Sequence, residues 1–272
     1  MLDKQILDLQ KIVGAFLYYG RGVNPTIIHT MNDIALVQTE ATIEQVQAAK
    51  YLLDYLTTHP DAAIRYLGSK MILHIHSNAS YLTATKAQLR AGGHFFLSPN
   101  KKKNAPYNGP IHSLVKIIKN VVLSAAEAEL GGLFLNAQET MTICNTLEEL
   151  GHPQPATPTH TDNTTAKGII HGTCKPQKTK AMDMQYHWLK DRQTQNHFDF
   201  YWEPGKTNLG DVYTKHYPPK YHRTLRPYIL MNTNKDLTDR HLQGCVDSLI
   251  PSVTHGCKKD ASGVNQLSAN NK

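Results

Sequence analysis

Residues 71–97, MILHIHSNASYLTATKAQLRAGGHFFL, contain two runs of β-type sequence joined by a polar stretch. In the first run, Leu73 and Ile75 alternate with two histidines, which is the period of a strand. Asn78 stands at the expected end of this strand, and AGGHFFL supplies the second strand. A sheet therefore begins near residue 71, and the fold must be built around it.

The residues before this sheet have the period of helices. Three segments are predicted to be helical: LDKQILDLQKIVGAFLYYGRG, PTIIHTMNDIALVQ and TIEQVQAAKYLLDYLTTHP. In the third, Thr42 can cap the helix and Pro60 stops it. Because helical period gives way to strand alternation near residues 66–71, we expect a small helical segment over residues 1–68 and a separate domain over residues 69–232.

The residues after 97 continue the sheet and add helices to it. We expect a third strand in IHSLVKIIKNVVL, a long helix from Ser124 to Gly151, a strand in PATPTHTD, helices in NTTAKGIIHG and KTKAMDMQYHWLKDRQTQN, and a strand in HFDFYWEPG. This order of elements is typical of an α/β domain.

The net charge is compatible with more than one class of protein, and the cysteine spacing indicates no cysteine-based framework. The chain has 272 residues and a formal net charge of +7, which suits a partner that is a polyanion and equally suits an ordinary soluble protein. Its four cysteines form no C-x-x-C pair, so neither a zinc knuckle nor a disulfide framework is indicated.

The sequence predicts neither a secretory signal peptide nor a membrane span. The N-terminus is too charged for a signal peptide, and no run approaches the ~20 apolar residues of a membrane span. We therefore expect an intracellular protein without a membrane partner. Residues 233–272 are polar, and we expect this tail to be partly disordered.

Three carboxylates stand at positions where side chains can gather into a site. Asp162 ends the strand PTHTD, and Asp211 opens a helix expected in DVYTKHY. In the long helix, Ser124 and Glu127 form the capping pair S-x-x-E, which explains Glu127 as a helix-start residue. Glu129 points about 200° away from Glu127, so it is either a solvated surface carboxylate or a residue of a site.

Three stretches carry a family resemblance: LSAAEAELGGLFLNAQE, HTDNTTAKGIIHGTCKPQKTKAMDMQYHWLKD and FYWEPGKTNLGDVYTKHYPPKYHRTL. They resemble the S-x-x-E-A-E helix start, the D-N-x-x-A and K-x-x-D-x-x-Y-H motifs and the final A-D-x-x-T-K of the ribonuclease H domain in copia-type retrotransposon Pol polyproteins. Residues 1–70 resemble the segment that joins the end of reverse transcriptase to this domain. The resemblance spans roughly residues 8–230, and its motifs come in the family's order.

The resemblance implies a ribonuclease H-like mixed five-stranded sheet flanked by helices. It also implies hydrolysis of the RNA strand of an RNA–DNA hybrid, by two Mg²⁺ ions (or Mn²⁺) that lie about 3.5–4 Å apart and hold the attacking water and the leaving oxygen. Mg²⁺ prefers hard, charged oxygen ligands. Carried over by motif, the catalytic and metal-binding positions are Asn78, Glu129, Asp162 and Asp211.

Position 78 departs from the family pattern, which has S-D-A where this chain reads Ser77-Asn78-Ala79. In the family, this carboxylate touches both metal ions. An amide oxygen brings no charge to an ion, and a unit charge 4 Å away is worth roughly 4 kcal/mol at an effective dielectric of 20. Even if relaxation halves this figure, activity falls by ~10–10³-fold. Asn78 therefore predicts an impaired metal site.

Four more residues are candidates for contact with nucleic acid. Lys101, Lys102 and Lys103 form a basic loop that can lie on phosphates, although a solvated run of charge explains them as well. Asn163 can contact the nucleic-acid backbone or orient Asp162, and helix N-capping is an equal explanation.

The sequence leaves three functions open. The first is hydrolysis of RNA in RNA–DNA hybrids, impaired at position 78. The second is a non-catalytic module that keeps the fold and binds nucleic acid through its basic surface. The third is a relic of the element that is under no selection. For the first two, the expected partner is an RNA–DNA hybrid or another nucleic acid, and we expect a monomer.

Overall fold

The computed structural model describes residues 3–40, 42–84, 88–101, 103, 105–120, 122–174 and 180–230. The predicted tail, residues 233–272, lies outside these residues. The N-terminal elements are α1 (Asp3–Gly22), the 3-10 helix η1 (Pro25–Ile27), α2 (Ile28–Leu36), η2 (Gln38–Glu40) and α3 (Ile43–Thr58). The remaining elements are β1 (Ile72–Ala84), β2 (Gln88–Ser98), β3 (Pro110–Ile118), α4 (Ala125–Glu149), β4 (Thr157–Thr161), α5 (Thr164–Ile170), α6 (Lys180–Thr194), β5 (Phe198–Trp202), η4 (Gly205–Thr207), η5 (Leu209–Tyr213) and α7 (Pro219–Ile229).

The five strands form one mixed sheet in the order β3-β2-β1-β4-β5. The β1–β2 and β2–β3 pairs are antiparallel, whereas the β1–β4 and β4–β5 pairs are parallel. The parallel pairs require crossovers, which α4 and the α5–α6 pair provide. This mixed five-stranded sheet, flanked by helices and preceded by a helical segment, confirms the predicted ribonuclease H-like fold class.

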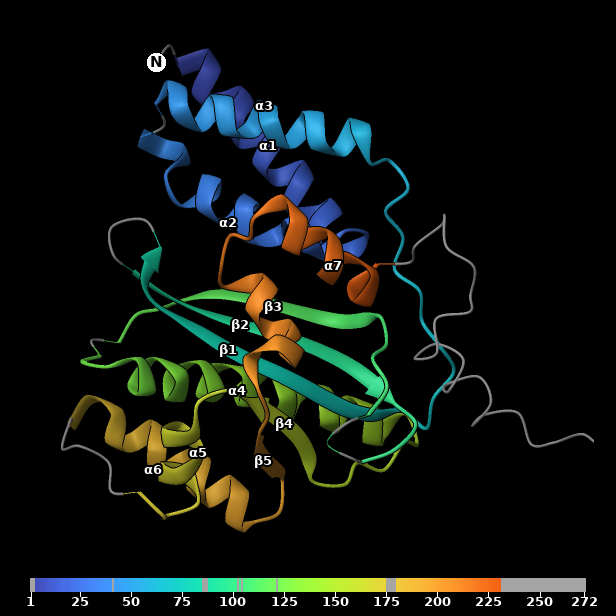
Figure 1. Cartoon of the computed structure of the whole chain (residues 1–272), viewed down its shortest axis with the longest axis vertical. Coiled ribbons are helices and arrows are strands. Elements are labelled where there is room, and N and C mark those ends of the chain that lie inside the picture. Colours follow the sequence, from blue (N-terminus) through green and yellow to red (C-terminus); the bar gives the residue numbers. More distant parts are fainter. Residues whose placement is uncertain are drawn as a thin grey trace, which may run out of the picture.

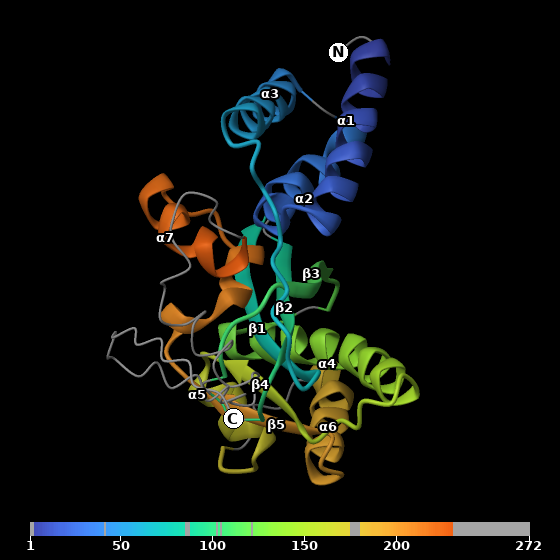
Figure 2. The same cartoon turned by 90° about the vertical axis from the view of Figure 1, so that its right-hand side faces the viewer.

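Helices cover both faces of the sheet. Figures 1 and 2 show α4, α5 and α6 below the sheet, and α1, α2, α3 and α7 above it. The main core lies between the sheet and α4, where Leu73, Ile75, Phe95 and Leu133 are fully buried. Among the described residues, no helix is long and apolar enough to cross a membrane.

The N-terminal helices have a small core of their own. Apolar side chains from α1, η1, α2 and α3 pack together, and Met31 at the centre is fully buried. Helix α3 begins with the predicted capping residue, because Thr42 and Gln45 form a capping box. The division between residues 1–68 and 69–232 stays a prediction.

Asn78 lies in the middle of β1 and not at its end as the sequence suggested. The strand continues because its backbone stays paired with β2, with Asn78 opposite Gly92 and Ser80 opposite Arg90. What ends near Asn78 is the pairing with β4, whose last register pair along β1 is His76 with His160. The strand alternation of the sequence cannot distinguish these two endings, because it does not show which neighbour a strand pairs with.

The second face of the sheet buries a layer of histidines: His74, His76, His94 and His160. The 3-10 helix η5 covers this face, since the Leu209 amide donates to His76 Nδ1 at 3.2 Å and the Tyr213 hydroxyl lies 3.0 Å from His94 Nδ1. The side chains on both faces of β1 are therefore buried from Leu73 to Ser80, although the sequence of the strand alternates apolar and polar residues.

A buried arginine joins the helical segment to the sheet. Arg90 of β2 is 1% exposed, and its guanidinium contacts Asp33 and His29 of α2. Asp33 also accepts a hydrogen bond from His216 Nε2, at 2.7 Å, in the segment after η5. Because an unpaired buried guanidinium is very costly, these contacts fix α2 against the sheet.

The buried histidines predict a loss of stability in weak acid. Burial lowers the pKa of His74 to about 4 and that of His94 to about 3. Both values lie below that of an unfolded histidine, so the stability that these neutral rings contribute is complete above pH ~6.5 and is lost as the pH falls toward the folded values. Across this window each histidine lowers the free energy of unfolding by about 1.4 kcal/mol per pH unit.

Urea unfolding between pH ~6.5 and ~4.5 measures this slope. In the variant His94→Gln, one histidine fewer takes up a proton on unfolding. Its free energy of unfolding should therefore depend less steeply on pH than that of the wild type, whatever the absolute stability of the variant. Because the raised pKa values of Glu129 and Asp162 act in the opposite direction, the comparison of the two proteins is the test, and equal slopes in wild type and His94→Gln would contradict a neutral, buried His94.

Candidate functional site

Four predicted site residues come together where the sheet opens beyond the β1–β4 pairing. Asn78 in β1 and Asp162, directly after β4, each follow by two residues the paired His76 and His160, so both lie just beyond the point where the β1–β4 pairing ends. Glu129 reaches this place from the first turns of α4, and Asp211 reaches it from η5. Residues 78, 129, 162 and 211 therefore share one location.

Glu129 is buried between α4 and β1. Its Oε1 accepts a hydrogen bond from the Ala79 amide at 3.0 Å, and its Oε2 is buried without a hydrogen-bond partner among the described residues. Burial raises the pKa of Glu129 well above its usual range, and the nearby carboxylates of Asp162 and Asp211 raise it further. This rules out the solvated surface position that the sequence left open.

Glu127 has the structural role that its position predicts. Its amide donates to Ser124 Oγ at 3.3 Å, and its side chain accepts from the Leu123 amide at 2.6 Å. This capping arrangement fixes the start of α4 and with it the direction of Glu129, two residues further along the helix.

Asp162 follows β4 directly and is half-buried. The Trp202 indole donates to its carbonyl oxygen at 2.9 Å, which ties the end of β4 to the end of β5. Burial raises the pKa of the Asp162 carboxyl, and the charge of Asp211 raises it further. The negative charge of Asp211 therefore acts on both Glu129 and Asp162.

Lys215 supplies a positive charge to this cluster. Its Nζ lies 2.7 Å from Asp211 Oδ1. Burial lowers the pKa of Lys215, but the hydrogen bond to Asp211 and the charges of Asp162 and Glu129 raise it on balance. The sequence analysis did not single out Lys215, although its spacing of four residues from Asp211 is a signal for an ion pair.

Asn78 is buried and turned toward the Asp211 segment. Its Nδ2 donates to Thr214 Oγ1 at 2.5 Å, and only 1% of the residue is exposed. The Thr214 hydroxyl can donate as well as accept, so a carboxylate at position 78 could keep this contact as an acceptor. Asn78 is therefore a buried, neutral group that is hydrogen-bonded to the segment carrying Asp211.

Two glycines let the Asp211 segment approach the sheet. A Cβ on Gly92, which pairs with Asn78, would lie 2.6 Å from Thr214 Cγ2 and 2.7 Å from the Gly210 carbonyl oxygen. A Cβ on Gly210 would lie 2.6 Å from the His76 carbonyl oxygen. Both distances are too short for any side chain, so the close packing of η5 on β1 and β2 requires glycine at both positions.

The residues predicted to contact nucleic acid lie in different surroundings. Asn163 caps α5, because its Oδ1 accepts from the Ala166 amide at 2.9 Å. Lys103 lies over the Tyr201 ring of β5, with its Nζ 3.8 Å from Asp199 Oδ2, and Lys101 is exposed. Lys102 lies outside the described residues.

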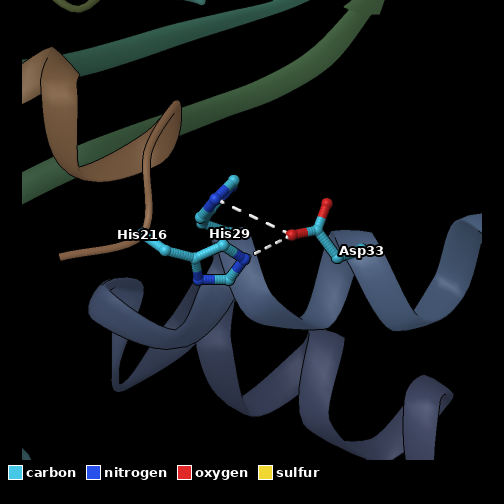
Figure 3. A group of neighbouring side chains, drawn as sticks. All are labelled: His29, Asp33 and His216. Carbon is cyan, nitrogen blue, oxygen red and sulfur yellow. Dashed lines mark hydrogen bonds and ion pairs between the residues drawn. The ribbon is translucent and has the colours of Figure 1, made fainter. Parts of the chain in front are cut away.

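A second group of titratable side chains lies apart from the carboxylates, between α2 and the segment after η5. Figure 3 shows His29, Asp33 and His216, whose potential ligand atoms all lie within 4.8 Å of one another. The guanidinium of Arg90 already contacts His29 and Asp33. Because a metal-bound histidine donates its other ring N–H to an acceptor, and Arg90 is a donor, this group is better suited to a buried ion pair than to a metal.

The chain is similar in sequence to proteins of plant transposons. No protein-family model matches it. It is 22% identical over 222 residues to a retrovirus-related Pol polyprotein from transposon TNT 1-94 of Nicotiana tabacum, covering 82% of this chain. It is 26% identical over 193 residues to the Pol polyprotein from transposon RE1 of Arabidopsis thaliana, covering 68% of this chain. The homologues of this chain are thus retrovirus-related Pol polyproteins of plant transposons, of whose lengths it spans 16% and 12%.

Solved structures with related architecture are more distant. A foamy viral protease-reverse transcriptase in complex with RNA/DNA hybrid is 14% identical, with a TM-score of 0.48, over 85% of this chain and 27% of that one. LC11-RNase H1 in complex with RNA/DNA hybrid is 11% identical, with a TM-score of 0.37, over 50% of this chain and 88% of that one.

The close approach at Gly92 predicts a large effect of a single methyl group. Gly92→Ala should destabilise the protein by about 1–3 kcal/mol, because the new Cβ meets backbone at Gly210 as well as Thr214. The matched control is Gly14→Ala in α1, where a Cβ meets nothing within 4 Å, so it should be neutral or stabilise by up to about 1 kcal/mol. Urea unfolding compares the two variants, and equal effects would contradict the close packing of η5.

Proposed function

We propose that this chain, whose homologues are retrovirus-related Pol polyproteins, has a ribonuclease H-type site for two-metal hydrolysis of RNA in RNA–DNA hybrids, and that Asn78 impairs it. The main support is the gathering of Glu129, Asp162 and Asp211 beside Asn78. These residues come from four separate elements, and each of the three carboxylates lies near enough to another for its charge to act on it. Their oxygens do not all lie within 4.8 Å of one another, since among the described residues only His29, Asp33 and His216 form a group with that spacing, so bound ions would have to draw the carboxylates together.

The donor set suits Mg²⁺. Glu129, Asp162 and Asp211 offer hard, charged oxygens, and the buried Oε2 of Glu129 lacks a hydrogen-bond partner among the described residues. When bound, Mg²⁺ would lower the pKa of a water and stabilise charge on the leaving oxygen. The carboxylates would hold the ions, and their mutual repulsion, seen in the raised pKa values of Glu129 and Asp162, would be relieved.

Asn78 weakens this site in two ways. It removes one unit of negative charge from the position that in the resembled family touches both ions, and its amide is engaged with Thr214. With the charge of Lys215 added, the cluster of Glu129, Asp162, Asp211 and Lys215 has a formal charge of −2 when all its groups are ionised, which is low for the two divalent ions proposed. Residual activity should therefore be small.

The second candidate is a nucleic-acid-binding module without catalysis. The observation in its favour is the Lys215–Asp211 ion pair of 2.7 Å, which provides a cation at the carboxylates without any metal. In this case the fold and the basic surface bind nucleic acid, and the cluster is structural.

Restoring the carboxylate tests the nuclease proposal. Asn78→Asp is almost isosteric, adds charge beside Glu129, Asp162 and Asp211, and should tighten Mg²⁺ binding and raise cleavage of a labelled RNA–DNA hybrid by ~10-fold or more. Wild type and variant are compared with Mg²⁺ and with Mn²⁺, and Mg²⁺ affinity is measured by titration calorimetry.

The double variant Asn78→Asp/Asp162→Asn is the matched control, because it has the same net charge as the wild type and lacks a different ligand. Gain of cleavage in the single variant and its loss in the double one would support a site damaged at one position. A folded Asn78→Asp protein with neither cleavage nor tighter Mg²⁺ binding would favour the binding module.

Both candidates predict binding through phosphates. Since Lys and Arg contacts release counterions, the logarithm of hybrid affinity should fall linearly with the logarithm of salt concentration. Fluorescence anisotropy of a labelled hybrid across a salt series measures the slope. Absence of binding, or binding that is indifferent to salt, would remove both candidates.

A further inference from the structure

A cavity of roughly 620 Å³ lies between the helical segment and α7, beside the carboxylate cluster but separate from it. Its lining includes three tyrosines, two arginines and two histidines, and none of the described residues that line it carries a carboxylate. The volume is that of a small-molecule site. No part of the proposed hydrolysis uses this cavity.

The lining is mainly apolar, and its polar part consists of aromatic and cationic side chains together with two threonines. Tyr51 and Tyr55 come from α3, while Arg223 and Arg226 come from α7. Tyr55 stacks on His59 with ring centroids 4.6 Å apart, so flat faces are already arranged in this wall. The Tyr55 hydroxyl and Arg226 Nε are buried without a hydrogen-bond partner among the described residues, which leaves polar groups for a ligand to satisfy after a small movement.

Rings and guanidinium groups together suit a nucleotide. Bases stack on aromatic side chains whatever their sequence, and arginines hold the phosphates. An unpaired nucleotide suits the cavity better than a duplex does, because only an unpaired base can insert its faces between side chains.

Tyr217 connects the cavity with the carboxylate cluster. It lines the cavity and follows Asp211 by six residues, in the segment between η5 and α7. The cavity and the carboxylate cluster therefore share one short stretch of chain.

We propose that this cavity binds an unpaired nucleotide, with its base against Tyr51, Tyr55 or Tyr217 and its phosphate on Arg223 and Arg226. It would hold the single-stranded end of a nucleic acid whose paired part lies at the carboxylates. The second statement rests on the proposed function, whereas the first does not.

The test uses the full chain and three labelled probes: a blunt RNA–DNA hybrid, the same hybrid with a single-stranded overhang of about five nucleotides on either strand, and the single-stranded oligonucleotide alone. The wild type should bind an overhang more tightly than the blunt hybrid, and it should bind the oligonucleotide. Tyr51 is 66% exposed and Arg223 is exposed, so both can be changed without loss of the core.

The two substitutions have different signatures. Tyr51→Ala should weaken binding of the overhang probe and the oligonucleotide by roughly 5- to 150-fold with an unchanged salt slope, because it removes stacking alone. Arg223→Ala should reduce the salt slope for the oligonucleotide by about 0.7, the value of one phosphate contact. The matched controls Tyr18→Ala and Arg21→Ala remove exposed residues of α1 outside the cavity and should change neither.

The outcomes separate the two proposals. If Tyr51→Ala and Arg223→Ala behave like the α1 controls, or if the wild type does not bind the oligonucleotide, the cavity has another occupant, such as a segment of this chain or an apolar ligand, and the inference is wrong. If the oligonucleotide binds with the expected signatures but the blunt hybrid does not, the nucleotide site stands and the proposed function fails.

Discussion

The site depends on how closely η5 can approach the sheet. Gly92 on β2 and Gly210 on η5 have no side chains at the point of contact, so backbone meets backbone beside Asn78. This contact places Asp211 near Asp162 and Glu129, sets Thr214 against the Asn78 amide and buries the histidine layer of the second sheet face. The segment that this approach holds in place carries Asp211, contacts the buried histidines His76 and His94, and supplies Tyr217 to the wall of the cavity.

The same segment couples the helical part of the chain to the sheet. Just after η5, His216 donates to Asp33 of α2, and Asp33 also pairs with the buried Arg90 of β2. Removing one partner of a buried pair costs about 3–5 kcal/mol, because the other charge stays buried alone. A displacement of α2 would therefore disturb the segment that carries Asp211, and through Tyr217 the cavity as well.

The charged groups of the cluster act on one another's ionisation. Glu129 and Asp162 already have raised pKa values, so the site is electrostatically unfavourable without a cation. Lys215 partly relieves this repulsion, which makes a folded, metal-free cluster possible. In the proposed nuclease, the neutral Asn78 would favour this ion pair over divalent ions.

The sequence alone determined what depends on local pattern and on motif. It predicted the five strands, most of the helices and the capping role of Glu127, because periodicity and caps are properties of neighbouring residues, and the family resemblance implied the mixed sheet. It did not predict α7, and the helix expected to open at Asp211 is the 3-10 helix η5, which begins at Leu209. It did not predict that both faces of β1 are buried, that Arg90 pairs with α2, or that a cavity lies between α3 and α7. These features join residues far apart in the chain, such as Arg90 and Asp33 or Tyr51 and Arg223, and only tertiary packing decides which distant side chains become neighbours.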